Sequence, residues 1–211
     1  MWALSELGGS SMANGIRFIP FLLLLLPGVA ACSNTKSFDW REDVRLSDGR
    51  VIVVDRKEEY RQVMDVGAGF RIGWLFQRSS IAANLPAPIN RKVSWEGSLQ
   101  PLALDIQPDR TVYLVCIVTT GVGRDEWSVP DNEVHVSFHL TAEGWRRISL
   151  SQIPQSVQAN LLGNTQTLFI DRRSKSGIHV DLKLKRELDS DLRMDKRFRT
   201  IVRPLAPEGK Q

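Results

Sequence analysis

An Asp-Gly pair between two apolar segments is the sequence feature that most limits how this chain can fold. Asp48 and Gly49 favour the two-residue loop of a β-hairpin, because both central positions of such a loop take positive φ. Folding the chain about this loop brings four apolar residues onto one face. The expected pairs are Leu46 with Val51 and Val44 with Val53. The segment 43–54 therefore predicts an antiparallel hairpin with one apolar and one mixed face.

Further strand-like segments follow at short intervals, with turn residues such as Gly, Pro, Asn and Asp between them. The segments expected to be strands are 70–76, 92–96, 102–106, 111–119, 134–140, 145–150, 167–170 and 178–184. Residues 121–132 are expected to form a loop, and leucines after Arg186 suggest a short amphipathic helix. The fold is therefore predicted to be mainly β, an antiparallel β-sandwich or barrel-like sheet with a short C-terminal helix.

The N-terminal residues show the order of a bacterial export signal. Arg17 precedes an apolar run over 18–26, and small residues follow it. The run is shorter than the roughly 20 apolar residues of a transmembrane helix. The four residues Val29, Ala30, Ala31 and Cys32 resemble the bacterial lipobox, whose cysteine becomes the lipid-modified first residue of the mature protein. The alternative is a plain cleaved signal with an incidental cysteine.

This interpretation divides the chain into a lipoprotein signal peptide at 1–31, a tether at 32–39, a single β-rich domain at 40–205 and a flexible tail at 206–211. The start codon stays open between Met1 and Met12. By resemblance to the sorting pattern of Gram-negative lipoproteins, Ser33 in place of Asp after the cysteine favours the outer membrane. Several acyl chains hold a protein to a membrane durably. We therefore expect a lipid-anchored protein of the outer membrane that faces the periplasm.

The cysteine content and the charge argue against a disulfide, a nucleophilic cysteine and nucleic-acid binding. The chain has two cysteines, and Cys116 lies inside the apolar run 112–118, so we expect a buried thiol rather than a disulfide or a nucleophile. The formal net charge of +4 comes from mixed signs spread along the chain. Such a mild excess is not the footprint of a nucleic-acid-binding protein, and no nucleic-acid partner is expected.

Three histidines are candidates for metal ligands or catalytic residues. His135 and His139 have the spacing that binds zinc on a helix, but their segment alternates like a strand, which places them roughly 13 Å apart. We therefore predict no metal site, and expect His135, His139 and His179 to be solvated surface residues. No Gly-x-Ser-x-Gly motif, nucleotide loop or Ca²⁺ loop occurs in the chain. No catalytic residue and no cofactor is predicted.

The best candidates for a binding surface are Trp127, His135 and His139. Trp127 is chosen because its segment is polar and contains Gly and Pro, whereas the other tryptophans of the mature chain are expected to pack in the core or at sheet edges.

The segment 40–54, which opens Trp-Arg-Glu-Asp-Val-Arg-Leu-Ser-Asp-Gly-Arg, resembles the opening of a family of uncharacterised proteobacterial lipoproteins. Two later segments are similar to that family as well: 145–154, with Asn160 and Leu161 following it, and 199–204. The family brings no known activity, so the resemblance implies a lipoprotein with a β-rich domain and no particular site residues.

Taken together, these patterns predict a non-enzymatic binding or structural module of the cell envelope. Its partners would be the membrane, through the lipid anchor, and another envelope protein or a glycan. Two alternatives stay open. One is a periplasmic hydrolase whose site is assembled from distant residues, and the other is a lipoprotein component of a secretion or conjugation system, or an immunity protein.

Overall fold

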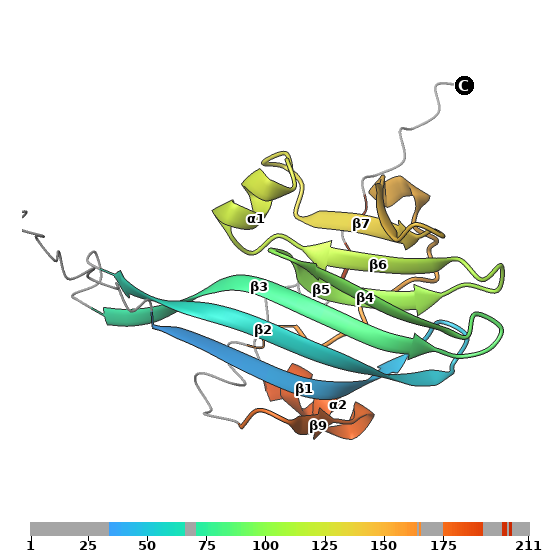
Figure 1. Ribbon diagram of the computed structural model, residues 1–211, viewed down its shortest axis with the longest axis horizontal. Helices are drawn as coiled ribbons and strands as arrows, with labels where there is room; N and C mark the ends of the chain where they lie inside the picture. The colour runs from blue at the N-terminus through green and yellow to red at the C-terminus, as the bar shows by residue number, and fades with distance from the viewer. Residues whose placement is uncertain are drawn as a thin grey trace, which may run out of the picture. The chain divides into compact units, whose positions relative to one another are not determined.

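The computed structural model describes residues 34–65, 71–163, 165, 175–191, 200–201 and 203, and their strands form two sheets (Figure 1). The first sheet has the order β4-β3-β2-β1-β9 and contains β1 (Thr35–Arg45), β2 (Val51–Asp65), β3 (Arg71–Leu85), β4 (Arg91–Gly97) and β9 (Ile178–Val180). The second has the order β5-β6-β7-β8 and contains β5 (Gln100–Ile106), β6 (Val112–Ile117), β7 (His135–Leu140) and β8 (Trp145–Ile148). Within these residues neither sheet closes into a barrel, so the mainly β prediction is confirmed as two layers.

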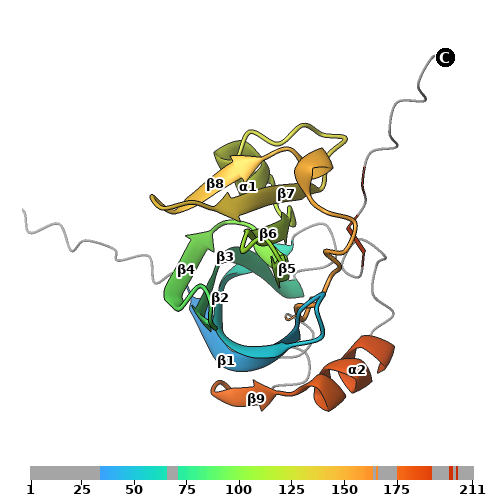
Figure 2. The same ribbon diagram turned by 90° about the vertical axis from the view of Figure 1, so that its right-hand side faces the viewer.

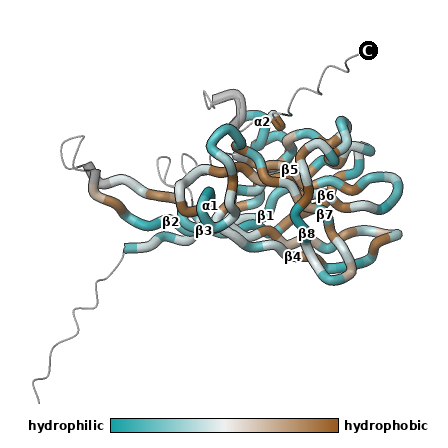
Figure 3. Tube along the Cα trace, turned by 90° about the horizontal axis from the view of Figure 1, so that it is seen from above, coloured by the Kyte–Doolittle hydropathy of each residue, from teal (hydrophilic) through white to brown (hydrophobic). Residues whose placement is uncertain are grey.

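The main core lies between the two layers (Figure 2). Strands of both sheets contribute alternate side chains to this core, as pleated strands do when one face is buried. From the first sheet come Val44, Ile52, Val54, Ile81 and Trp95, and from the second come Leu104, Leu114, Cys116, Val136 and Phe138. Figure 3 shows the alternation as changing colour along the trace, with brown hydrophobic stretches at β5. The two sheets are thus held together by one apolar layer, while Val180 of β9 packs in a separate cluster with Trp40, Leu162 and Leu188.

The first hairpin forms where the sequence predicts it, but its register is shifted by one residue. Val44 pairs with Ile52, and Asp43 pairs with Val53. The loop is longer than expected, because the Leu46 amide donates to the Arg50 carbonyl and Gly49 takes a φ of 88°. This is the three-residue loop in which glycine occupies the left-handed position. The prediction that Val44 and Leu46 share a buried face is therefore confirmed, but the prediction that Val51 and Val53 lie on the same face is wrong.

The consequence of this shift is visible in the burial of β2. Val51 and Val53 are 46% and 48% exposed, whereas Ile52 and Val54 are buried. A one-residue change of register moves every side chain of a strand to the opposite face. β1 also begins at Thr35, so the strand takes in part of the segment 32–39 that we assigned to a tether.

The helices differ from the sequence prediction in extent. The segment expected as a loop contains α1 (Gly121–Glu126), whose N-cap Thr120 accepts a hydrogen bond from the Gly123 amide. The segment 178–184 is a strand only at β9, and α2 (Leu182–Asp191) then begins earlier than the expected start after Arg186. The expected strand 167–170 lies outside the described residues. None of the helices described is long and apolar enough to cross a membrane.

Charged side chains are buried on the inner face of the first sheet, beyond the apolar core. We call Glu42, Arg56, Glu58 and Lys185 the buried charge cluster. Arg56 donates to Glu42 Oε2 at 3.1 Å and to Glu58 Oε1 at 3.2 Å, and Lys185 Nζ lies 2.5 Å from Glu42 Oε1. The side chains of Arg56 and both glutamates are inaccessible to solvent. Two positive and two negative groups thus balance inside the protein.

Hydrogen bonds from distant segments complete this cluster. The Leu162 amide donates to Glu42, and the Leu162 carbonyl accepts from Arg56 at 3.0 Å. Tyr60 and Thr165 both donate to Glu58. Burial by itself would raise the pKa of Glu42, but the charges of Lys185 and Arg56 and these hydrogen bonds hold it below its usual value. The glutamate is therefore ionised in its buried position.

The outer face of the second sheet is partly covered by the chain that follows β8. Ile153, Val157 and Ile201 pack with Ala103 and Val115 in a separate apolar cluster. A 3₁₀ turn over Leu150–Gln152, η1, starts this covering segment. β5 is buried along its whole length as a result. The part of the same face that lies toward β7 and β8 is left open, and it forms the groove described next.

Candidate functional site

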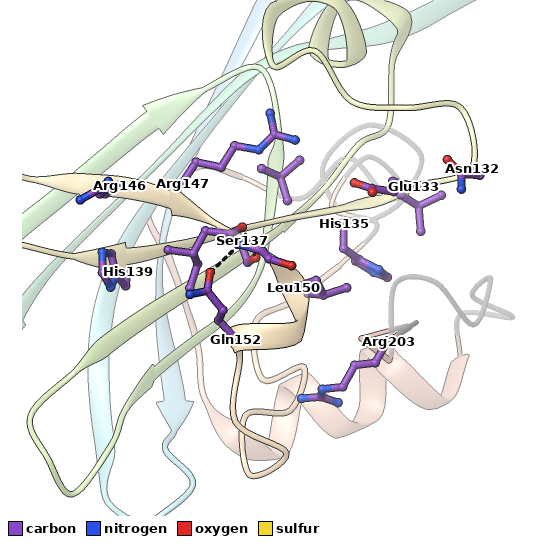
Figure 4. A pocket seen from close by; sticks show the side chains of 14 residues that line it. Asn132, Glu133, His135, Ser137, His139, Arg146, Arg147, Leu150, Gln152 and Arg203 are labelled. Carbon is purple, nitrogen blue, oxygen red and sulfur yellow. Dashed lines mark hydrogen bonds between the residues drawn. The ribbon is translucent and has the colours of Figure 1, made fainter. Parts of the chain in front are cut away.

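A groove runs over the outer face of β7 and β8 (Figure 4). Val136 and Phe138 of β7 point into the main core, so the intervening residues His135, Ser137 and His139 point outward and form the floor of the groove. This division follows from the two-residue period of a strand. The groove has a volume of about 920 Å³. A space of that size is within the range of small-molecule and oligomer binding sites.

The walls of the groove come from three parts of the chain. η1 supplies Leu150 and Gln152 on one side, β8 supplies Arg146 and Ile148, and Arg203 reaches in from near the C-terminus. A capping box at Ser149 fixes η1, because the Gln152 side chain accepts from the Ser149 amide at 2.9 Å. The walls are therefore held by hydrogen bonds and not only by side-chain packing.

The structure overturns the expectation that His135 and His139 are solvated. His135 is only 4% exposed, and His139 is partly buried. The segment after β8 lines the same side of β7 with Leu150 and Gln152, and so reduces the exposure of a face that the alternation pattern alone predicts to be solvated. His139 Nε2 is buried and has no hydrogen-bond partner among the described residues. The groove floor thus carries a polar atom without a protein partner.

Two arginines in the groove carry charges that no carboxylate of the described residues neutralises. Arg146 lies directly opposite His139 in the β7–β8 pairing, and its side chain is exposed without a hydrogen bond or ion pair in the described structure. Arg203 donates from Nη2 to the carbonyls of Pro154 and Val157, at 3.0 and 2.7 Å. Those carbonyls fix the position of the Arg203 guanidinium, but because they are uncharged they do not neutralise it.

Ser137 is not presented as a nucleophile. Its side chain is 1% exposed, and its Oγ donates to the Ile148 carbonyl at 3.0 Å. A serine nucleophile needs a hydrogen bond to a histidine that is itself oriented by a carboxylate. The groove brings a serine and two histidines together, as the hydrolase alternative requires, but Ser137 is engaged with the backbone.

Trp127 lies away from the groove, although we predicted the three residues as one binding surface. It is the C-cap of α1, and its ring packs on Trp95 and Phe138 with centroid distances of 6.3 and 5.1 Å. Gly97 packs closely against the Trp127 ring, because a Cβ added at Gly97 would lie 3.2 Å from that ring. Trp127 thus closes one end of the main core.

The remaining predicted residues are also separate from the groove. His179 is on β9, and its Nε2 lies 2.8 Å from Asp43 Oδ1 at the surface of the first sheet. Cys116 is buried in the main core, where burial raises the pKa of its thiol well above the usual value. It is a free cysteine, as the sequence predicts. Val29, Ala30, Ala31 and Cys32 lie outside the described residues.

Metal binding finds no support in the part of the chain that the structure describes. No group of three or more His, Cys, Asp or Glu side chains there is placed to hold an ion. The spacing of His135 and His139 along β7 separates the two histidines as expected for a strand.

Fold and groove together define a two-layer β-sandwich with a cationic, histidine-floored groove on one outer face. No family model, no curated protein and no solved structure matches this chain.

Proposed function

We propose that this protein is a lipid-anchored binding module of the bacterial cell envelope, and that the groove on the second sheet is its binding site. The module would be attached to the outer membrane through Cys32 and face the periplasm. The groove would receive a part of another envelope component, a protein or a glycan. This proposal joins the N-terminal export pattern to the groove on the outer face of β7 and β8.

The observation that carries the binding role is the state of the groove floor. His139 Nε2 is buried without a partner, and Arg146 beside it has no ion pair among the described residues. A buried polar group without a hydrogen bond costs about 1–3 kcal/mol, so such groups in native proteins call for an explanation. A bound ligand that supplies the missing partners is that explanation. The rigid strand under these groups would hold them in place for it.

Photo-crosslinking from inside the groove tests the binding role. A photoreactive phenylalanine analogue replaces Leu150 on the groove wall, and a matched variant carries it at Val53, which is 48% exposed on the first sheet. In living cells of the native host, the Leu150 variant is expected to give a discrete adduct with a protein or glycan of the envelope. The Val53 variant is expected to give none. Equal labelling from both positions, or no adduct from Leu150, would contradict the proposal.

Metabolic labelling with a palmitate analogue tests the anchor. The unchanged chain is expected to take up the label and to fractionate with membranes, since several acyl chains bind a bilayer durably. Cys32→Ser should lose both properties, whereas Cys116→Ser should keep the label because that thiol is buried in the core. A plain cleaved signal would instead leave the unchanged chain unlabelled.

A further inference from the structure

We infer that the ligand of the groove carries an oxyanion, a carboxylate or a phosphate, and that Arg146 and His139 bind it. This inference rests on the proposed binding role of the groove and gives the chemical class of its ligand. Three features of the groove support it: the charge of its lining, its unused hydrogen-bonding groups and its size.

The charge of the lining favours an anion. Arg146, Arg147 and Arg203 line the groove, and Glu133 is the one carboxylate among its described lining residues. Glu133 lies at the end of the groove next to Asn132, away from Arg146 and His139 (Figure 4). Arg147 donates to the Trp127 carbonyl and so is directed toward α1. Arg146 is left as the guanidinium with all its donors available, and guanidinium groups match carboxylates and phosphates in geometry.

The unused hydrogen-bonding groups of the groove are mainly donors. Gln152 already accepts from the Ser149 amide through Oε1, which leaves its NH₂ group toward the groove. The Ser137 hydroxyl donates its proton to the Ile148 carbonyl. His139 and Arg146 are directly opposite in the β7–β8 pairing, and such residues have Cβ atoms about 5 Å apart, so both side chains lie on the groove side of the sheet. When His139 Nε2 carries a proton, it and the Arg146 guanidinium are two donors that fit the two oxygens of one oxyanion.

The groove is too large for a lone ion and has an apolar part. Its volume is about 920 Å³, and Ile148 and Leu150 supply apolar surface beside the donors. A ligand that fills it would place an anionic group at Arg146 and a larger body against these two side chains. This combination describes an organic acid or phosphate ester, such as an acidic sugar unit, rather than a free inorganic anion.

NMR titration of the full-length chain in a non-ionic detergent tests the inference. The probes are sodium acetate and sodium phosphate, with sodium chloride holding the ionic strength constant and glucose as a neutral probe. At least one oxyanion is expected to give saturable shifts at the β7 and β8 amides, and glucose none. Arg146→Gln should weaken the apparent affinity by about tenfold or more, the cost of losing one charged hydrogen bond. Arg146→Lys should retain part of it.

Arg41→Gln is the matched control, because Arg41 is exposed on the first sheet and the substitution makes the same change in net charge. It should leave the titration unchanged. Saturation by phosphate alone would identify a phosphate-bearing ligand, and saturation by acetate alone a carboxylate. If neither probe saturates, or if Arg146→Gln binds like the unchanged chain, the inference is wrong. A groove adduct from Leu150 that persists in that case would keep the binding role and assign it a neutral ligand.

Discussion

Replacing Arg56 by methionine is expected to lower the free energy of unfolding by about 3–5 kcal/mol, the usual effect of removing one partner from a buried ion pair. Arg56 lies between Glu42 and Glu58 at 3.1 and 3.2 Å, and all three side chains are inaccessible to solvent. The variant keeps two buried carboxylates with only Lys185 to balance them. The main-chain carbonyls of Leu162 and Pro101 also lose their donor.

Denaturant unfolding followed by circular dichroism measures this effect. Arg50→Met is the matched control, because Arg50 forms an ion pair with Asp48 but its side chain is 40% exposed. That substitution should change the free energy of unfolding by only about 0–1 kcal/mol. If the two variants lose the same stability, the buried charge cluster does not hold the first sheet and the C-terminal segments together in the way described.

Replacing Phe138 by alanine is expected to cost about 3–5 kcal/mol of stability. Phe138 is 1% exposed, and its ring lies 5.8 Å from that of Trp95 and 5.1 Å from that of Trp127, measured between centroids. The substitution removes a large side chain where both layers and α1 meet. The surrounding aromatic rings are held by the sheets and cannot fill the space completely.

Thermal unfolding and near-ultraviolet circular dichroism report this loss, since both tryptophans lie in the affected contact. Val122→Ala provides the comparison, because Val122 is 54% exposed on α1 and should shift stability by no more than about 0.5 kcal/mol. A Phe138→Ala variant with unchanged stability and an unchanged aromatic signal would show that the end of the main core packs differently.

Much of the sheet structure follows from local patterns, but the choice of register does not. Asp48 and Gly49 predict a hairpin correctly, and the three-residue loop that forms there changes which valines are buried. Both loops are compatible with the pair, and the difference lies in the packing of Ile52 and Val54 on the second sheet. The full length of β2 is not apparent from the sequence either. Its charged residues Arg56 and Glu58 indicate a solvated segment, but in the fold they are buried as an ion pair.

The sequence predicts the C-terminal helix but not its start, and it does not predict α1, because the local signals of both are weak or mixed. α1 contains Gly121 and Gly123, which have low helix propensity, and it forms where Gly123 packs closely on the Ser98 carbonyl. The alternating apolar residues of 178–184 suit a strand, but the strand ends at Val180 and Leu184 packs from the helix beside Trp40. The position of α1 and the start of α2 therefore depend on contacts with residues distant in the sequence, Ser98 for α1 and Trp40 for α2.

The candidate site was found only in part. His135 and His139 were named from the sequence as binding residues, and the structure places both on the groove floor. Arg146 could have been added from the hairpin around Gly144, because folding the chain there sets it opposite His139. Arg203 could not, since nothing local indicates that the chain near the C-terminus returns to the second sheet and donates to the Pro154 carbonyl.

The buried charge cluster also dictates an order of folding. Glu42 accepts a hydrogen bond from the backbone amide of Leu162, 120 residues further along, and Glu58 accepts one from the side-chain hydroxyl of Thr165, 107 residues further along. Until those residues are available, the inner face of β1 and β2 carries carboxylates that have to stay in water. We therefore expect the inner face of the first sheet to be completed late in folding, by contacts between residues far apart in the chain. If the chain emerges from the ribosome or an export channel N-terminus first, the carboxylates of Glu42 and Glu58 are expected to stay exposed to water until Leu162 and Thr165 have emerged.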